Sequence, residues 1–443
     1  MRVKKKNSKL FYGLGAMGKD LYSAFIGSFL TIYLTDVYGL SGTAMGTLFV
    51  IARIWDAIND PMMGIIVDKT NTRWGKFRPY LILSPIAMAA AMLMLFTVPQ
   101  IGGTGKIVWV YVAYILYGMS FTAYDVPYMS FSYVITDDGD ERVSYLAGSR
   151  IVTMLCTGIV GIFALRTMES FGGRAVGYKS FVIILIVVAL LMAWLCGGRN
   201  KEVGMHQSEA HSMRDYIDMI LKNRPFQRVI VCIVLVTTSL NLLSGMLMYY
   251  LTYYIGNKDY YTLIMLLELF IPTAMMAMTG KLCRKIGKKP AQLLANGFLI
   301  AGSVTLFMSG KTVSLMILGM IIMFMGIGII LVTATAQMAD TVDYSEWKLG
   351  KRSEGVIFSM NSFAIKLGQA IGGGIIGFGI TAIGYKANQV QTSSTLFGIR
   401  VLIAVVPLIL AIVNLAVYSG YELNNQTMKQ MERELKERRN KEM

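Results

Sequence analysis

The stretch Arg53-Ile54-Trp55-Asp56-Ala57-Ile58-Asn59-Asp60-Pro61 lies near the end of an apolar run, residues 43–67, that is long enough to cross a membrane as a helix. Each charged side chain inside hydrocarbon costs about 2.5–3.5 kcal/mol on insertion scales. At about 100° per residue, Asn59, Asp56, Asp60 and Arg53 fall on one stripe of that helix. Asp56 and Asp60 are one turn apart, so both carboxylates can face one small cation. The stretch therefore predicts a polar, ligand-binding face inside a membrane helix.

The composition of the whole chain agrees with a membrane protein. The 443 residues are 55% hydrophobic and 15% charged, with a mean hydropathy of +0.54, which excludes an ordinary soluble domain. Most of the apolar stretches are long enough to span a bilayer. They lie at residues 10–35, 43–67, 79–98, 107–135, 147–170, 178–197, 229–256, 260–280, 291–310, 313–338, 355–382 and 396–420. We therefore expect an all-α membrane protein with twelve transmembrane helices.

The positive charge is distributed as in a membrane protein. Lys and Arg number 42 against 26 Asp and Glu, a net charge of +16. Most of the basic residues lie in the N-terminal segment, in the loops after the even-numbered stretches and in the C-terminal tail. This asymmetry predicts a multi-pass protein of the cell membrane with both termini cytoplasmic. The basic tail is expected to lie near anionic membrane lipid rather than to bind nucleic acid.

The sequence offers no sign of a resident cofactor or of catalysis. Its four cysteines are scattered without metal-ligand spacing, and His206 and His211 lie in a polar loop without companion ligands. No nucleophile–base pair stands out. We therefore expect neither a cofactor nor an enzyme.

The chain divides into two similar halves. The only long polar break, residues 199–228, predicts a six-helix bundle on each side, over residues 1–198 and 229–422, with a cytoplasmic linker between them and a basic cytoplasmic tail at 423–443. The loop after the second stretch contains Gly75-Lys76-Phe77-Arg78-Pro79, and the loop after the eighth contains Gly287-Lys288-Lys289-Pro290. Gly75 and Gly287 are 212 residues apart, about half the chain. Such a repeat predicts two related bundles around a midplane site.

Further charged residues lie inside the predicted spans. Lys19 and Asp20 lie in the first, Asp125 in the fourth, Arg150 near the start of the fifth and Lys366 in the eleventh. Intramembrane charges pair with one another or mark the path of a permeant.

The residue types favour a cation site and a sugar site. Sodium prefers oxygen ligands, which Asp56, Asp60, Asn59 and the Thr122 hydroxyl can supply. A proton on one aspartate is the alternative. For a sugar, Asp20 and Asp125 can accept hydrogen bonds from hydroxyls, and Lys19 and Arg150 can donate. Tyr124 and Tyr128, which flank Asp125, could offer rings for stacking.

Several motifs together resemble the glycoside–pentoside–hexuronide:cation symporters of the major facilitator superfamily. They are the opening stretch, Gly13-x-Gly15-Ala16-x-Gly18-Lys19-Asp20, Tyr33-x-Thr35-Asp36-Val37-x-Gly39-Leu40-Ser41, Arg73-Trp74-Gly75-Lys76-Phe77-x-Pro79 and Ala339-Asp340-x-Val342-Asp343-Tyr344-x-Glu346. The resemblance runs from about residue 11 to residue 421. It implies two pseudo-symmetric six-helix bundles that transport by alternating access.

The resemblance also implies roles for individual residues. The cation ligands are Asp56, Asp60 and Thr122, with Asn59 beside them, and the sugar contacts are Lys19, Asp20, Asp125 and Arg150. Lys366 is linked to the cation site, and Arg53 is grouped with it as a coupling residue. The charged residues that close the cytoplasmic side are Arg142, Asp340, Asp343 and Arg352. Met129, which we also expect to line the substrate site, and Val332 stand where a galactoside-transporting member has tryptophans, so the identity of the sugar does not carry over.

We therefore predict a monomeric sugar symporter that imports a glycoside or a related sugar with Na⁺, or with H⁺ or Li⁺ as alternative coupling ions. The alternatives are a proton-coupled sugar or uronide symporter, a carrier of lipids or other amphiphiles on the same fold, and a membrane sensor that does not transport.

Overall fold

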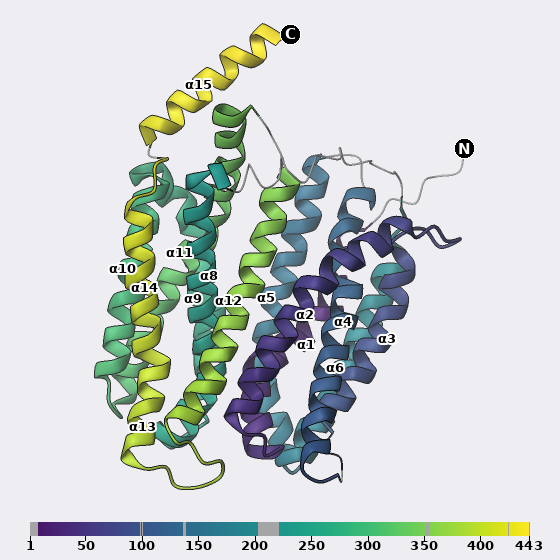
Figure 1. Cartoon of the computed structure of the whole chain (residues 1–443), viewed down its shortest axis with the longest axis vertical. Coiled ribbons are helices and arrows are strands. Elements are labelled where there is room, and N and C mark those ends of the chain that lie inside the picture. The colour runs from purple at the N-terminus through teal and green to yellow at the C-terminus, as the bar shows by residue number, and fades with distance from the viewer. Residues whose placement is uncertain are drawn as a thin grey trace. The chain divides into compact units, whose positions relative to one another are not determined.

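The computed structural model describes residues 8–97, 99, 101–135, 139–202, 221–350, 354–423 and 425–442 (Figure 1). Within these residues the regular structure is helical, apart from one isolated bridge between Thr72 and Gly75. The chain forms two compact units, which are described separately. One comprises Met1–Ser208 with Tyr261–Leu266, and the other comprises Glu209–Tyr260 with Leu267–Met443.

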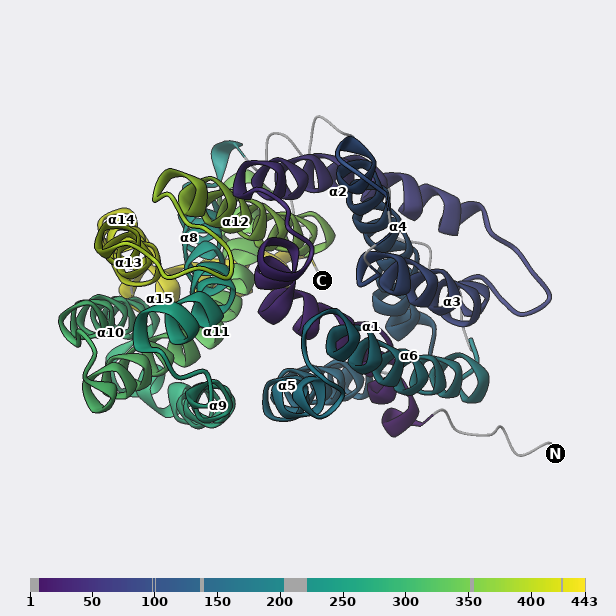
Figure 2. The ribbon, with the colours of Figure 1, turned by 90° about the horizontal axis from the view of Figure 1, so that it is seen from below.

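Over its described residues, the first unit is a bundle of six long helices. They are α1 (Lys9–Ile32, extended by the π-helical turn η1, Tyr33–Val37), α2 (Gly42–Lys69), α3 (Arg78–Leu95), α4 (Thr104–Ile135), α5 (Gly139–Ser170) and α6 (Arg174–Arg199). Helix α1 packs against α5 and α6, α3 packs against α4 and α6, and α2 packs against α4 (Figure 2).

Over its described residues, the second unit also contains six long helical segments, followed by a terminal helix. These segments are α8 (Arg224–Tyr249, extended by η2, Tyr250–Ile255), α9 (Tyr260–Ile286), α10 (Lys288–Met308), α11 (Val313–Leu349), α12 (Glu354–Ala382), and the continuous series α13 (Ser393–Arg400), η3 (Val401–Val405) and α14 (Val406–Ser419). The terminal helix is α15 (Asn425–Glu442). Helix α8 packs against α12 and α14, and α10 packs against α11 and α14.

The two units share one packing scheme. If α1 to α6 are matched in order with α8, α9, α10, α11, α12 and α14, the four most closely packed pairs of each unit correspond, whereas α9 packs less closely on α11 than α2 does on α4. The first helix of each unit also ends in a π-helical turn. The predicted pair of pseudo-symmetric six-helix bundles is therefore confirmed.

Local signals explain where several helices begin and end. The Ser41 side chain caps α2 by accepting a hydrogen bond from the Ala44 amide at 3.2 Å. Asn223 caps α8 in the same way, and Pro225 fits its first turn, so α8 begins at Arg224, inside the segment predicted as a linker. Gly287, with φ of +94°, separates α9 from α10.

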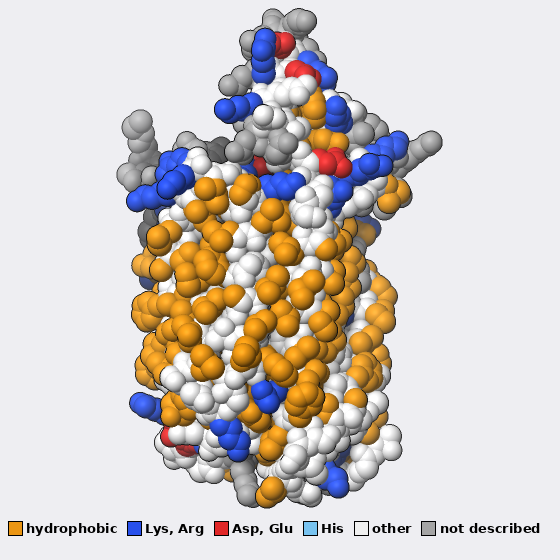
Figure 3. Space-filling view, turned by 90° about the vertical axis from the view of Figure 1, so that its left-hand side faces the viewer, with side chains coloured by type: hydrophobic (Ala, Val, Ile, Leu, Met, Phe, Trp, Pro, Cys, Tyr) orange, Lys and Arg blue, Asp and Glu red, His pale blue; other side chains and the backbone are white. Residues whose placement is uncertain are grey.

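Ten helical spans are long and apolar enough to cross a membrane, judged over the described residues. Helices α1 and α2 are also long, with 24 and 28 residues, but their charged residues lower their hydropathy. The space-filling view shows hydrophobic side chains over the middle of one face, with Lys and Arg toward both of its ends (Figure 3). A hydrophobic surface between charged ends is the pattern expected of a protein that spans a bilayer.

Candidate functional site

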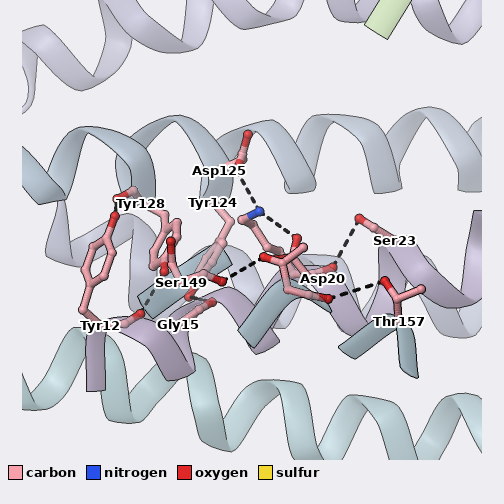
Figure 4. Close-up of polar contacts among 11 residues, drawn as sticks. Tyr12, Gly15, Asp20, Ser23, Tyr124, Asp125, Tyr128, Ser149 and Thr157 are labelled. Atoms are coloured by element: carbon pink, nitrogen blue, oxygen red, sulfur yellow. Dashed lines mark hydrogen bonds and ion pairs between the residues drawn. The ribbon is translucent and has the colours of Figure 1, made fainter. Parts of the chain in front are cut away.

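A buried cluster of charges joins α1, α4 and α5. The Lys19 Nζ atom lies 2.7 Å from Asp20 Oδ1 and 3.3 Å from Asp125 Oδ1 (Figure 4). Asp20 Oδ2 also accepts a hydrogen bond from the Thr153 hydroxyl at 2.5 Å. Lys19 and Asp20 are each only 7% exposed. One ammonium group therefore holds two carboxylates, one from its own helix and one from α4.

Two glycines allow α1 to approach its neighbours closely. A Cβ atom on Gly15 would lie 2.6 Å from the Tyr128 ring, and a Cβ on Gly18 would lie 2.8 Å from the Cβ of Ala193 on α6. Any larger residue would push the helices apart, so these glycines fix the position of the Lys19–Asp20 pair.

Tyr124 and Tyr128 connect α4 to the backbone of α1. The Tyr124 hydroxyl donates to the Gly15 carbonyl at 2.9 Å, and the Tyr128 hydroxyl donates to the Tyr12 carbonyl at 2.8 Å (Figure 4). The rings of Tyr12 and Tyr128 stack with centroids 4.7 Å apart. Both Tyr124 and Tyr128 are fully buried, which argues against the expectation that their rings stack on a sugar.

A second polar cluster joins α2 and α4. The Thr122 hydroxyl donates a hydrogen bond to Asp60 Oδ1 at 2.9 Å, and Arg53 Nη1 lies 3.0 Å from Asp56 Oδ2. Gly118 makes room for α2, because a Cβ there would lie 3.2 Å from Asp56 Oδ1. The polar side of α2 that the sequence predicts therefore contacts α4 through both Asp56 and Asp60.

Asn59 lies on the same helix with an unsatisfied amide. The residue is 9% exposed, and its buried Nδ2 atom has no hydrogen-bond partner within the described residues. A buried amide group without a partner is costly. A hydrogen-bond acceptor at this position would reduce that cost, whereas a cation would be bound by the amide oxygen.

Helix α4 brings the two clusters together. Thr122 and Asp125 are three residues apart on it, so their Cβ atoms are about 5–6 Å apart on one side of the helix. Thr122 contacts the α2 cluster and Asp125 contacts the Lys19 cluster. A cation site and a site for a hydrogen-bonding substrate can thus be neighbours within the first unit.

Other expected site residues lie elsewhere or are not described. The side chains of Arg142 and Arg150, and the whole of Arg352, lie outside the described residues. Met129 lies on α4 and is 39% exposed. In the second unit, Lys366 on α12 is half-buried and Asp343 lies on α11.

Asp340 forms an ion pair inside the second unit. Lys288 Nζ lies 2.6 Å from Asp340 Oδ1 and 2.7 Å from Oδ2. Lys288 belongs to the glycine-containing loop that repeats at half length, so the pair joins the start of α10 to α11.

The sequence interpretation missed Thr153 and Gly118. Thr153 is three residues after Arg150, one turn along α5, and this spacing was the available signal. Gly118 could not be singled out, because it is one of 44 glycines. No group of three or more His, Cys, Asp or Glu side chains that could hold a metal ion occurs in the described part of the chain.

Comparison with known sequences extends over nearly the whole chain. A family model described as "MFS/sugar transport protein" matches residues 11–425. The chain is 29% identical to the isoprimeverose transporter of Lactiplantibacillus pentosus, over 91% of this chain and 86% of that protein. It is 28% identical to the glucuronide carrier protein homolog of Escherichia coli (strain K12), over 97% and 95%. It is also 28% identical to an E. coli protein whose name proposes a glycoside/cation symporter, over 96% and 94%.

Solved structures show the same fold. The nucleoside transporter NupG superposes with a TM-score of 0.69 at 14% identity, covering 92% of this chain and 99% of that one. A bacterial homolog of the human lysosomal transporter Spinster gives 0.69 at 10% identity, covering 96% of each chain. At these identities the likeness concerns the fold alone, which is that of the major facilitator superfamily.

Proposed function

Because this chain belongs to the family of MFS/sugar transport proteins, and so is a multi-pass membrane protein, we propose that it imports a sugar together with a monovalent cation, with Na⁺ as the coupling ion. The main support for the proposal is that two polar clusters meet α4 one helical turn apart. Thr122 bonds to Asp60 in one cluster, and Asp125 pairs with Lys19 in the other. Relatives with sugar or glycoside transport in their names support it.

The α2 cluster has the ligands that a small hard cation needs. Asp56 and Asp60 supply two carboxylates, and Asn59 and Thr122 supply neutral oxygens. The Arg53 guanidinium offsets one of the two negative charges while the site is empty. When a cation binds, it relieves the remaining repulsion between the carboxylates, so a filled site favours a different helix arrangement from an empty one.

The Lys19 cluster suits a neutral polyhydroxylated substrate. It holds one ammonium and two carboxylates, so its described charges sum to a negative value. Carboxylates accept hydrogen bonds from sugar hydroxyls, whereas an anionic uronide would be repelled unless Arg150 supplied a compensating charge. We therefore favour a glycoside or pentoside over a uronide.

Coupling to Na⁺ would drive accumulation. One positive charge that moves inward across about 100 mV is worth roughly 2.3 kcal/mol, to which the concentration gradient of the ion adds. Because the potential and the gradient of the ion both drive Na⁺ inward, import is the favoured direction.

Uptake into proteoliposomes tests the proposal. Purified protein would be assayed with isoprimeverose and with a glucuronide, the sugars in the names of two relatives, with and without an inward sodium gradient. We expect sodium-stimulated uptake of at least one sugar, and its loss in Asp56→Cys and in Asp60→Cys. Uptake that ignores sodium but collapses with a protonophore would instead support the proton-coupled alternative. The absence of uptake for all sugars, with transfer of a fluorescent lipid, would support an amphiphile carrier.

A further inference from the structure

One membrane-embedded carboxyl group in the second unit has no assigned role. Glu268 is the only acidic residue of α9, in the span Tyr260–Ile286. The buried residues of this helix are Tyr261, Ile264, Met265, Pro272 and Thr279, and its exposed apolar residues include Leu263, Phe270 and Met278. At about 100° per residue, Glu268 falls in the centre of the buried side, opposite the exposed one. Glu268 is itself half-buried, and it lies on the packed side of the helix rather than on the side with the exposed apolar residues.

The internal repeat places Glu268 at the position of Asp56. Helix α9 is the second helix of its unit in chain order, as α2 is of the first unit. The spacing that separates Gly75 from Gly287, 212 residues, also separates Asp56 from Glu268. Each of the two helices also approaches the fourth helix of its unit at a glycine. A Cβ on Gly118 would lie 3.2 Å from Asp56 Oδ1, and a Cβ on Gly328 would lie 2.5 Å from the carbonyl oxygen of Pro272, one turn after Glu268.

The second unit lacks the partners that Asp56 and Asp60 have. At the same spacing, Met265 stands in place of Arg53, and Pro272 stands in place of Asp60. One turn to either side of Gly328, helix α11 carries Phe324 and Val332, which offer no hydroxyl like that of Thr122. Within the described residues, Glu268 forms no hydrogen bond or ion pair.

Charged groups on the neighbouring helices are distant or turned outward. On α9, the nearest charged residue is more than twelve positions from Glu268. On α11, the nearest is twelve positions from Gly328, and twelve residues extend roughly 18 Å along a helix axis. These groups are Lys281, Arg284 and Lys285 on α9, and Asp340, Asp343, Glu346 and Lys348 on α11. On α5, which meets Met265 at Gly161, the nearest described charges are Arg166 and Glu169, and both are exposed.

Pro272 adds a second unsatisfied acceptor at the same place. Because proline has no N–H, it cannot donate the helical hydrogen bond that the backbone carbonyl of Glu268 would otherwise accept. Glu268 thus presents acceptors on its side chain and on its backbone without a nearby cationic donor.

We propose that Glu268 is a proton-binding site, distinct from the cation site on α2. A carboxylate without a counter-charge is expensive inside a membrane protein, and a bound proton removes that charge. A metal cation would need several further oxygen ligands, which the apolar neighbours Met265, Phe324 and Val332 do not supply. If the chain is the symporter proposed above, the two halves of the repeat handle different ions, a metal cation on α2 and a proton on α9.

Infrared spectroscopy of the purified full-length protein tests the proposal without any sugar. Spectra of the wild type and of Glu268→Gln would be compared at about pH 6 and at about pH 9, on either side of neutral. We expect a C=O band of a protonated carboxyl in the wild type at the lower pH that disappears in Glu268→Gln. Glu202→Gln is the control, because it makes the same substitution at a carboxylate that lies outside the membrane-spanning helices and accepts three backbone hydrogen bonds. The absence of a band that depends on Glu268 at either pH would overturn the proposal.

A second measurement on the wild type covers the case in which Glu268→Gln does not fold. A hydrophobic carbodiimide reacts with protonated carboxyl groups in membranes, and peptide mass spectrometry locates the product. We expect modification of Glu268 that falls several-fold from about pH 6 to about pH 9. No modification at Glu268 at either pH, in protein whose other membrane-embedded carboxyls react, would count against it. If no sugar is taken up in the transport assay, the infrared and carbodiimide results on Glu268 are unaffected. The proposed function and the proton-binding site can therefore be refuted independently of each other.

Discussion

Thr122 on α4 donates a hydrogen bond to Asp60 on α2 across 2.9 Å, although the two residues are 62 positions apart in the chain. The contact ties a hydroxyl to one of the two carboxylates that the sequence places on a single stripe. Because Asp125 follows Thr122 by one turn, a shift of α2 on binding of the proposed cation would be transmitted to the Lys19 cluster through α4. This connection gives a physical route between the proposed cation and sugar sites.

Replacing Thr122 by valine should weaken sodium binding. The substitution keeps the shape of the side chain but removes both the donor to Asp60 and a neutral oxygen ligand. A hydrogen bond to a charged group contributes about 1.5–3 kcal/mol, so the affinity for Na⁺ should fall roughly 10- to 100-fold. A sodium titration of the thermal stability of the purified protein measures the effect. Thr122→Ser retains the hydroxyl and should bind nearly as the wild type does; equal sodium affinity in Thr122→Val would exclude Thr122 from the site.

Removing the charge of Lys19 should destabilise the first unit. Lys19→Met leaves the buried Asp20 and the half-buried Asp125 without their counter-charge, and breaking a buried pair such as Lys19–Asp20 costs about 3–5 kcal/mol. The double variant Lys19→Met/Asp20→Asn removes one of the uncompensated charges and should recover part of the loss. Thermal unfolding of the purified variants gives the comparison. A double variant less stable than Lys19→Met would show that the ion pair is not what holds Asp20 in place.

Glu202 should order the loop between α2 and α3. Its carboxylate accepts hydrogen bonds from the amides of Lys76 and Phe77 at 2.9 Å and from that of Arg78 at 3.2 Å, at the start of α3. Loss of such a cap costs about 0.5–2 kcal/mol, and a negative charge also favours a helix N-terminus. Glu202→Ala should therefore speed hydrogen exchange of these amides by roughly 2- to 30-fold, and Glu202→Gln should do so less.

Gly75 gives an independent test of the same contact. Its φ is +111°, and a Cβ there would come into contact with the Glu202 carboxylate, so Gly75→Ala should displace the carboxylate and strain the turn. The exchange rates in Gly75→Ala should resemble those in Glu202→Ala. Unchanged exchange in both variants would show that the loop is ordered by other contacts.

The sequence predicted the parts of this fold that depend on local pattern. Apolar run length indicated the spans, and helical periodicity placed Arg53, Asp56, Asn59 and Asp60 on one stripe, because both follow from the geometry of a single helix. The repeat between Gly75 and Gly287 indicated two related bundles, and the packing scheme confirms them.

Contacts between helices could not be predicted in the same way. Thr153 bonding to Asp20, and Glu202 bonding to the start of α3, depend on how helices rotate and approach one another. That approach is set by close contacts at small residues such as Gly15 and Gly18, whose importance is visible only once their neighbours are known. For the same reason, Tyr124 and Tyr128 were interpreted as possible sugar contacts, whereas the structure places them in the packing between α1 and α4.

The attachment of α15 to α11 should weaken in acid. Met431 and Leu435 of α15 pack on Trp347 of α11, and the Trp347 indole donates a hydrogen bond to Glu434 Oε2 at 2.6 Å. This hydrogen bond lowers the pKa of Glu434 below its usual value in the attached state. A carboxyl with a lowered pKa favours the attached state above its ordinary pKa of about 4.3, and this contribution is lost as the pH falls through the lowered value.

Tryptophan fluorescence measures this attachment. The chain has five tryptophans, so the signal of Trp347 is taken as the difference between the wild type and Trp347→Phe. We expect this difference to change on acidification in the wild type and to lose most of its pH dependence in Glu434→Gln, whose amide can still accept the indole hydrogen bond but cannot ionise. An unaltered acid transition in Glu434→Gln would assign it to another group, because Glu434 is the carboxyl that touches the indole.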